Sequence, residues 1–256
     1  MTAREIESEA YYLKSVGKAF KIIEALKTNE GMTMSELADE FDMPRSTAHV
    51  YLKTLNEIGY VVQQTNEYHL GFRFLEHGGY VRHRHHIYQA AKSEIDNLAR
   101  RTGEVVDFGI EENGKRVLVY KSEGPKSVTQ KPVTGDYVHM HMTALGKAML
   151  ATFEEKRVNE IVSRHGLPQA TQYTITTRDD LHAELDRTRE RSYSLENQER
   201  REGIRAVGAP LEHEGEVPSA ISISGPSSQL TDGYIEELER QIQDSINVIQ
   251  IKMRDY

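Results

Sequence analysis

The sequence contains no cysteine, and this absence excludes several kinds of site at once. A chain without cysteine has no disulfide framework, no thiolate metal site and no cysteine nucleophile. Long apolar runs are also missing, since no segment approaches the roughly 18 consecutive apolar residues of a membrane helix. The acidic first residues, MTAREIESEA, lack the apolar core of a signal peptide. We therefore expect a cytoplasmic protein with no membrane partner.

Positive charge is not in excess either. The formal net charge is −8 at pH 7, which argues against a protein that binds nucleic acid by charge alone. The chain has 256 residues, of which 38% are hydrophobic, so it can bury an ordinary core. This length favours a small domain followed by a medium one.

The first part of the chain has the pattern of three short helices and a hairpin. Apolar residues recur at helical spacing over residues 15–26. A capping box at Thr33 to Glu36 predicts a short second helix that ends near Phe41. A third helix is expected over residues 44–58, and residues 60–70 have the pattern of a small hairpin. This order predicts a winged helix-turn-helix.

The third predicted helix has an apolar side and a polar side. A projection at about 100° per residue places these residues on the apolar side: Ala48, Tyr51, Leu52, Leu55 and Ile58. The opposite side, which this fold presents to the major groove of DNA, holds Arg45, Ser46, His49, Lys53 and Asn56. A winged helix used only for protein contacts is the alternative, and the clustering of polar groups on one face disfavours it.

The side chains on the polar side suit different DNA contacts. Arg45 and Lys53 can contact guanine or phosphate. Ser46 and His49 can make shorter contacts to the backbone or to a base. Thr47 lies behind this face, so its contact is expected to be a flanking phosphate.

The charge of this module is unfavourable for tight DNA binding. Residues 11–75 contain seven lysines and arginines against eight aspartates and glutamates. The acidic residues are mainly in the first two helices and the turns, so the polar side of the third helix remains basic. Low intrinsic affinity can be offset by dimerisation on a two-fold operator.

Residues 72–84 are expected to form a connecting helix, interrupted by Gly78-Gly79. Beyond them the pattern is α+β. A helix is expected up to Arg101, then a hairpin whose turn is Asn113-Gly114. Later helices are expected over residues 143–152, 154–165, 178–191 and 232–252, and later strands over 204–211 and 217–224.

The stretch ISISGP, residues 221–226, alternates isoleucine and serine and predicts a strand with one hydroxyl face. Alternation alone leaves open whether Ser222 and Ser224 contact water or a ligand. The preceding strand contributes Ala206 and Gly208, whose small size leaves space for a small molecule beside the serines. We therefore predict that both serines donate hydrogen bonds to a small-molecule ligand, and that Gly225-Pro226 ends the strand.

Other patterns have weaker functional interpretations. Close histidines in the runs RHRHH (residues 82–86) and HMH (139–141) permit a metal sensor, but hydrogen-bonded or solvated histidine is the commoner case. An enzyme acting on a small acid is a further alternative, with no visible partner for its serines or histidines. No catalytic triad, phosphate-binding loop or dinucleotide loop is present, so we expect neither catalysis nor a cofactor.

Several separated blocks resemble the IclR family of transcriptional regulators: STAH with LKTL and GYV (within residues 46–61), HMTALGKA (141–148), GIRAVGAP (203–210) and ISISGP. The resemblance covers about residues 13–252 and looks greatest to members from salt-adapted archaea. It implies a winged helix-turn-helix over residues 11–72, a linker helix over 73–86, and a GAF-like α/β effector and oligomerisation domain over 87–256. It also implies homodimers or homotetramers that bind operator DNA and regulate catabolic genes in response to a small organic acid.

The resemblance also implies site residues. Pocket positions of the family map onto Met140, His141, the segment Ala144–Met149 with Leu145 and Met149, Glu196, Ile204, Ala206, Ser222 and Ser224. Two positions depart from the family pattern. Val50 replaces a usual arginine at the edge of the DNA-facing side, where it can contact a thymine methyl instead. Ala206 replaces a usual cysteine, which leaves more room and less polarity in the pocket.

Overall fold

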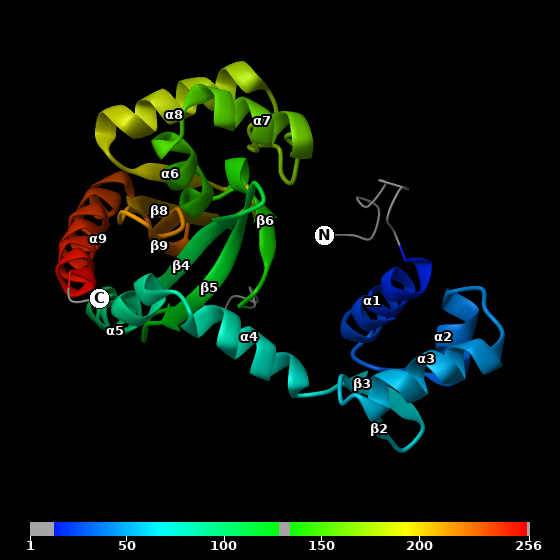
Figure 1. The fold of residues 1–256 in the computed structure, drawn as a ribbon. Helices are drawn as coiled ribbons and strands as arrows, with labels where there is room; N and C mark the ends of the chain where they lie inside the picture. Colours follow the sequence, from blue (N-terminus) through cyan, green and yellow to red (C-terminus); the bar gives the residue numbers. More distant parts are fainter. Residues whose placement is uncertain (1–12, 128–133, 255–256) are drawn as a thin grey trace. The chain divides into compact units, whose positions relative to one another are not determined.

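The computed structural model describes residues 13–127 and 134–254. The chain forms two compact units, one ending at Val81 and the other beginning at Arg82 (Figure 1). The boundary falls inside helix α4 (Arg73–His83). In the described part of the chain, no helix is both long and apolar enough to cross a membrane.

The N-terminal unit is a winged helix-turn-helix. Its elements are α1 (Lys14–Thr28), β1 (Met32–Thr33), α2 (Met34–Glu40), α3 (Arg45–Glu57), β2 (Val61–Gln64), β3 (Glu67–Leu70) and the start of α4. The predicted capping box is confirmed, because Glu36 N donates to Thr33 Oγ1 at 3.3 Å and Thr33 N donates to Glu36 Oε2 at 2.8 Å. The three strands have the order β1-β3-β2, so β1, which was not predicted, extends the hairpin into a small sheet.

Helix α3 has the two sides predicted for it. Ala48, Leu52 and Leu55 are buried against the core of this unit. Tyr51 is half-buried, whereas Ile58 is exposed because it caps the end of the helix rather than continuing its apolar side.

The C-terminal unit is a six-stranded antiparallel sheet covered by helices on both faces. Its helices are α5 (His86–Thr102), α6 (Ala144–Thr152), α7 (Glu155–His165), α8 (Arg178–Arg191) and α9 (Asp232–Met253). Its strands are β4 (Val105–Glu112), β5 (Lys115–Glu123), β6 (Tyr137–His139), β7 (Ser194–Asn197), β8 (Ile204–Leu211) and β9 (Ser219–Pro226). The strand order is β6-β5-β4-β9-β8-β7. The fold is therefore α+β, as predicted.

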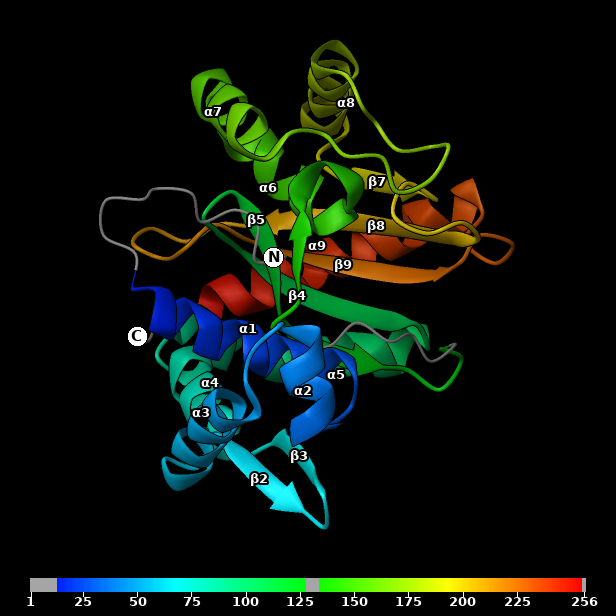
Figure 2. The same ribbon diagram turned by 90° about the vertical axis from the view of Figure 1, so that its right-hand side faces the viewer.

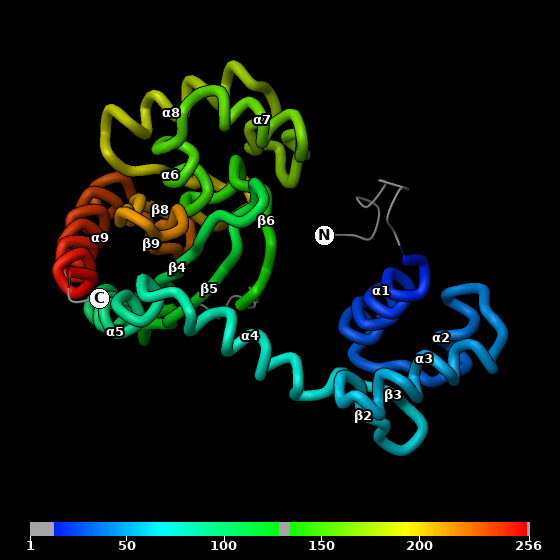
Figure 3. The backbone as a smooth tube through the Cα atoms, viewed as in Figure 1, coloured from blue at the N-terminus to red at the C-terminus, as the bar shows by residue number. Residues whose placement is uncertain are grey.

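The two faces of this sheet are covered differently. Helices α5 and α9 pack on one face, where Ile221 and Ile223 of β9 join the larger apolar core (Figures 1 and 2). Helix α6 packs on the other face, and the backbone trace shows α7 and α8 outside it (Figure 3). The alternation of ISIS therefore separates an apolar core from the space below α6.

Two details of the sheet differ from the sequence prediction. Strands β6 and β7 were not predicted, because segments of three and four residues have no recognisable periodicity. The prediction that Gly225-Pro226 ends the strand was wrong, because β9 includes both residues and Pro226 pairs with Ile204. The chain turns after Pro226, whose carbonyl accepts from the N–H groups of Gln229 and Leu230.

Candidate effector cavity and DNA-facing helix

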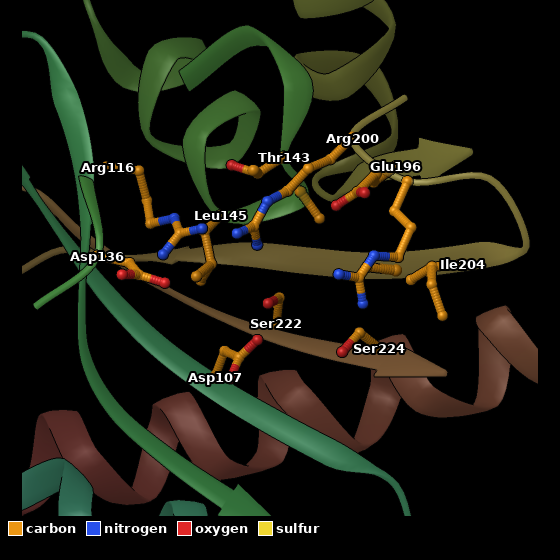
Figure 4. Close-up of a pocket in the computed structure, with 13 residues that line it drawn as sticks. Asp107, Arg116, Asp136, Thr143, Leu145, Glu196, Arg200, Ile204, Ser222 and Ser224 are labelled. Atoms are coloured by element: carbon orange, nitrogen blue, oxygen red, sulfur yellow. The ribbon is translucent and has the colours of Figure 1, made fainter. Parts of the chain in front are cut away.

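A cavity of about 200 Å³ lies between the sheet and the start of α6 (Figure 4). Its size suits a small metabolite, since pockets for drug-sized ligands hold roughly 300–1,000 Å³. Most of its lining is polar: Asp107, Arg116, Asp136, Thr143, Ala144, Leu145, Glu196, Arg200, Arg201, Ile204, Ala206, Ser222 and Ser224.

The register of the strands brings the polar side chains of the floor together. Ser222 on β9 pairs with Asp107 on β4. Ser224, two residues along, pairs with Ala206 on β8, which in turn pairs with Glu196 on β7. Because side chains alternate along a strand, both serines face the cavity while the isoleucines between them face the core.

The start of α6 forms the opposite wall. Thr143 caps the helix, its side chain accepting a hydrogen bond from Gly146 N at 3.0 Å. The backbone N–H of Ala144, at the first helical position, donates to the carboxylate of Glu196. The N-terminus of a helix carries partial positive charge from its aligned peptide dipoles, so this wall favours an anion in the cavity.

Two arginines point into the same space from different elements. The side chains of Arg116, from β5, and Arg200, from the loop after β7, converge above Ser222 and Asp107 in Figure 4. Arg116 is only 2% exposed, and within the described chain its Nε and Nη1 atoms have no hydrogen-bond partner. Burial, and then the positive charge of Arg200, lower the pKa of Arg116 to about 10, so it remains charged at neutral pH.

Burial raises the pKa of two acidic side chains that line the cavity. Burial, and then the neighbouring Glu199 carboxylate, raise the pKa of Glu196 to about 7. Burial also raises the pKa of Asp107, although Arg116 opposes the rise. A raised pKa reduces the negative charge that these carboxyl groups set against the lining arginines, and this favours binding of an organic anion.

A buried ion pair supports the loop that carries Arg200. Lys147 on α6 is fully buried, and its Nζ lies 2.7 and 2.5 Å from the two carboxylate oxygens of Glu199. Thr171 and Thr174 donate to the backbone carbonyl of Glu199, which ties the same loop to the segment before α8. These contacts position Glu196 and Arg200 on either side of Glu199.

The DNA-facing side of α3 is exposed along its length. Arg45, Ser46, His49, Val50 and Lys53 are all exposed, Val50 at 62%, and Thr47 is half-buried behind them. The exposed side chain of Lys53 lies 3.9 Å from Glu57, at a distance where a surface ion pair contributes little. This side of the helix is therefore free to make contacts outside the unit. Asn56 differs, because its Nδ2 donates to Val61 O at 3.1 Å and so holds the hairpin to α3.

Both units match one protein family. Residues 15–65 match the IclR helix-turn-helix domain, and residues 79–250 match the family described as bacterial transcriptional regulator IclR C-terminal. The chain belongs to the IclR family. It is a DNA-binding transcriptional regulator with a C-terminal effector-binding domain.

Individual IclR relatives cover nearly the whole chain. The probable HTH-type transcriptional regulator ArcR of Halobacterium salinarum is 30% identical over 94% of this chain and 94% of its own. The crystal structure of the Thermotoga maritima IclR has a TM-score of 0.80, at 31% identity over 94% of this chain and 99% of its own. An IclR homolog from Microbacterium hydrocarbonoxydans, complexed with 4-hydroxybenzoate, has a TM-score of 0.79. Its identity of 18%, over 93% of this chain and 98% of its own, supports the fold alone.

The IclR resemblance identified part of the cavity. Of the predicted effector residues, these line it: Leu145, Glu196, Ile204, Ala206, Ser222 and Ser224. Met149 is buried in the apolar core around α6, and Met140 and His141 lie in the short 3₁₀ helix before α6, outside the cavity. The space expected beside Gly208 does not exist, because a Cβ there would lie 3.1–3.2 Å from Ala144 and from Ser194 Oγ.

Six lining residues of the IclR-type cavity were not singled out from the sequence: Asp107, Arg116, Asp136, Thr143, Arg200 and Arg201. A signal existed for Asp107, because it interrupts the apolar run of a predicted central strand with a charge. Arg200 and Arg201 belong to the charged run ERREG, and such a run is typical of a solvated loop, so the sequence pattern did not indicate a cavity there.

The histidines of this IclR member lie outside the cavity. Burial lowers the pKa of His141 to about 4, and its Nε2 lies 3.2 Å from the Pro168 carbonyl. The His165 Nε2 lies 2.7 Å from the Asn113 carbonyl. Among the residues that the structure describes, no group of three or more metal-ligating side chains could hold a metal ion.

Proposed function

We propose that the cavity binds a small organic acid and that this binding controls the affinity of the protein for operator DNA. The observation that carries the proposal is the buried Arg116 guanidinium, with two N–H groups that have no partner within residues 13–127 and 134–254. A buried donor without a partner costs free energy that an anionic ligand recovers. Arg200 and the N-terminus of α6 attract the same anion.

The proposed effector is consistent with a distant relative of the same fold. The Microbacterium hydrocarbonoxydans homolog binds 4-hydroxybenzoate, which is a small organic acid. The chemical class therefore fits a cavity of this family, while the lining residues of this chain decide which acid it takes. We also propose that the protein controls catabolic genes, because a small organic acid that fits this cavity is a metabolite.

The proposed DNA contacts come from the exposed side of α3. Arg45 and Lys53 carry the positive charge that phosphates or guanine require. Ser46 and His49 make shorter polar contacts, Thr47 reaches a flanking phosphate, and Val50 packs against a thymine methyl. A regulator that contacts DNA acts where the chromosome is, which places it in the cytoplasm.

The proposed functional unit is a homodimer. Leu13, Val16 and Phe20 recur at the spacing of one helix face along α1, and all three are exposed. Phe72, at 86% exposure, and Leu75 form a second exposed apolar group at the start of α4, a helix with no buried residue. A second copy of the chain is the partner that removes this apolar surface from water in a protein that binds two half-sites.

We propose one role for each of the three predicted residue ranges. Residues 11–72 bind DNA, residues 73–86 form the linker, and residues 87–256 bind the effector and contribute to oligomerisation. The effector acts by binding one arrangement of the linkers more tightly than another, which changes the spacing of two recognition helices.

The proposed DNA contacts are tested by fluorescence anisotropy with DNA from upstream of the gene, at moderate salt. Because Arg45 and Lys53 supply charged contacts, the double variant Arg45→Ala/Lys53→Ala should bind at least about 30-fold more weakly than the wild type. Lys156→Ala is the matched control, since Lys156 is exposed on the C-terminal unit. Equal affinities of the wild type and the double variant would contradict the assignment.

A further inference from the structure

We propose that the effector is a polyhydroxylated carboxylic acid, a sugar acid whose carboxylate binds Arg116 and whose hydroxyl groups bind Asp107 and Ser224. This inference rests on the proposed function of the cavity and names the class of acid within it. It depends on which buried atoms of the cavity have no partner, and on what each of them requires.

The first group of unpaired atoms requires an acceptor. The Nε and Nη1 atoms of Arg116 are donors only, and nothing within the described residues accepts from them. Arg200 converges on the same space and adds a second positive charge (Figure 4). An anionic group satisfies both arginines, whereas a neutral hydroxyl leaves the charge uncompensated.

The second group requires the opposite chemistry. Oδ1 of Asp107 is buried without a partner in the described chain, and so is Oγ of Ser224. A ligand carboxylate only accepts hydrogen bonds, so it cannot satisfy Asp107 when Asp107 is ionised, whereas a hydroxyl both donates and accepts and suits either protonation state of Asp107. A ligand hydroxyl likewise either donates to or accepts from Ser224.

The strand positions of Asp107 and Ser224 favour a ligand with more than one hydroxyl. Asp107 pairs with Ser222 across the strands, and Ser224 lies two residues further along β9. Two residues of an antiparallel strand span about 6.8 Å. This backbone spacing favours a ligand with hydroxyls at different positions along its length over a ligand with a single hydroxyl.

The rest of the lining disfavours an aromatic acid. Its apolar side chains are Ala144, Leu145, Ile204 and Ala206, and none of the lining residues that the structure describes is aromatic. A flat aromatic ring prefers mostly apolar and aromatic walls. A ring would also place its carbon atoms against the hydroxyls and carboxylates of the floor, which would lose their water without gaining a partner.

The test is isothermal titration calorimetry of the full chain with probes that differ in one feature each. Gluconate and xylonate carry both a carboxylate and several hydroxyls. Sorbitol keeps the hydroxyls without the carboxylate, hexanoate keeps the carboxylate without the hydroxyls, and 4-hydroxybenzoate has one hydroxyl on a ring. At least one sugar acid should bind at least about tenfold more tightly than each of the other three, because each of these leaves a buried group unpaired.

Variants assign the two ends of the ligand. Arg116→Met should weaken the sugar acid by about 10- to 100-fold, because it removes a charged hydrogen bond. Ser224→Ala removes no hydrogen bond within the described chain, so it should fold normally and weaken the sugar acid by about 2- to 10-fold without affecting hexanoate. Asp107→Ala should also weaken binding of the sugar acid. Arg240→Met, at an exposed position on α9, is the control and should bind as the wild type does.

The possible failures are distinguishable. Hexanoate or 4-hydroxybenzoate binding as tightly as the sugar acids would overturn this inference and leave the proposed acid effector intact. Sorbitol binding as tightly as gluconate, or wild-type affinity in Arg116→Met, would overturn both. If no probe binds, the sugar-acid inference is wrong, and the proposed DNA-binding function is then judged by the anisotropy measurement, which uses none of these probes.

Discussion

At the scale of single residues, the cavity depends on groups whose charge is set by their surroundings. Arg116 stays charged despite burial, while Glu196 titrates near neutral pH because burial and Glu199 disfavour its ionised form. The charge of Arg116 is therefore constant around neutral pH, whereas the charge of Glu196 changes with pH in the same range. This arrangement keeps the cavity attractive to an anion and links it to pH.

Glu196 should make the stability of the protein depend on pH. Its pKa in the folded protein, about 7, is above the ordinary 4.5, so the stability that its protonated form confers is complete below about pH 4.5. That stability is lost as the pH rises through 7, by up to about 3 kcal/mol. Glu196→Gln stays neutral, so its stability should be within about 1 kcal/mol of that of the wild type at pH 5 and exceed it by about 3 kcal/mol at pH 8.

Urea unfolding followed by far-UV circular dichroism measures this difference, since the chain has no tryptophan to report by fluorescence. Glu214→Gln, at an exposed turn, is the control and should follow the wild type at both pH values. A Glu196→Gln variant that gains nothing between pH 5 and pH 8 would show that Glu196 is ionised at both.

The serines of the floor could be predicted from the sequence, whereas Arg116 could not. Ser222 and Ser224 lie on a regular strand, so alternation alone assigned them to one face. Arg116 lies on β5, whose register with β4 shifts between Phe108 and Gly109. At this bulge the adjacent residues Val119 and Tyr120 both pack with the core under α5 and α9, whereas Leu118 packs in the core around α6. A bulge changes which side chains share a face, and nothing in the local pattern marks it.

At the scale of secondary structure elements, the position of α6 depends on one glycine. A Cβ at Gly146 would overlap the backbone of Met140, because the 3₁₀ helix Met140–Met142 passes directly against the first turn of α6. This close approach is what brings Thr143 and Ala144 to the edge of the cavity. The glycine in HMTALGKA is therefore explained by packing rather than by ligand contact.

Gly146→Ala should destabilise the protein by at least about 2 kcal/mol, because the backbone of Met140 must move. Gly233→Ala is the matched substitution in another helix. Nothing lies within 4 Å of its added Cβ, so it should be neutral or stabilising by up to about 1 kcal/mol. Urea unfolding measures the free energy of unfolding of both variants. An equal loss of this free energy in Gly146→Ala and Gly233→Ala would contradict the role given to the contact with Met140.

The longer elements could be predicted from the sequence because each has its own signal. The caps at Thr33 and Thr177 both form as expected, and Asn113-Gly114 forms the hairpin turn with two positive φ values, 53° and 79°. Strand β1 has two residues and exists only because β3 offers it a partner. Such pairing is a property of the folded unit, which a local pattern does not contain.

At the scale of the whole molecule, the proposed regulation involves two chains and a ligand. The N-terminal unit carries the helix proposed to contact DNA, together with exposed apolar residues, and the C-terminal unit carries the cavity. Neither unit explains ligand-dependent DNA binding alone. A modest coupling of about 1–3 kcal/mol between them is sufficient to change DNA affinity by about 5- to 150-fold.

The proposed dimer predicts an association that depends on the exposed apolar residues of the N-terminal unit. Sedimentation equilibrium should give a mass of at least two 29.2 kDa chains. Phe20→Ser/Leu75→Ser should raise the dissociation constant at least about tenfold, since both side chains would lose their apolar contact. Val248→Ser, a partly exposed position on α9, should have no effect. A chain that remains a monomer at micromolar concentration would contradict the dimer.

The central claim is that an acid in the cavity changes the affinity for DNA. The direct measurement is the dissociation constant of the dimer for DNA from upstream of its gene, by fluorescence anisotropy, with and without the acid that binds most tightly in calorimetry. At an acid concentration just sufficient to saturate the wild type, we predict a change of at least about fivefold for the wild type and a much smaller change for Arg116→Met, whose DNA affinity without ligand should equal that of the wild type. Saturation of the wild type with no change in DNA affinity, or an undiminished response in Arg116→Met, would contradict the claim.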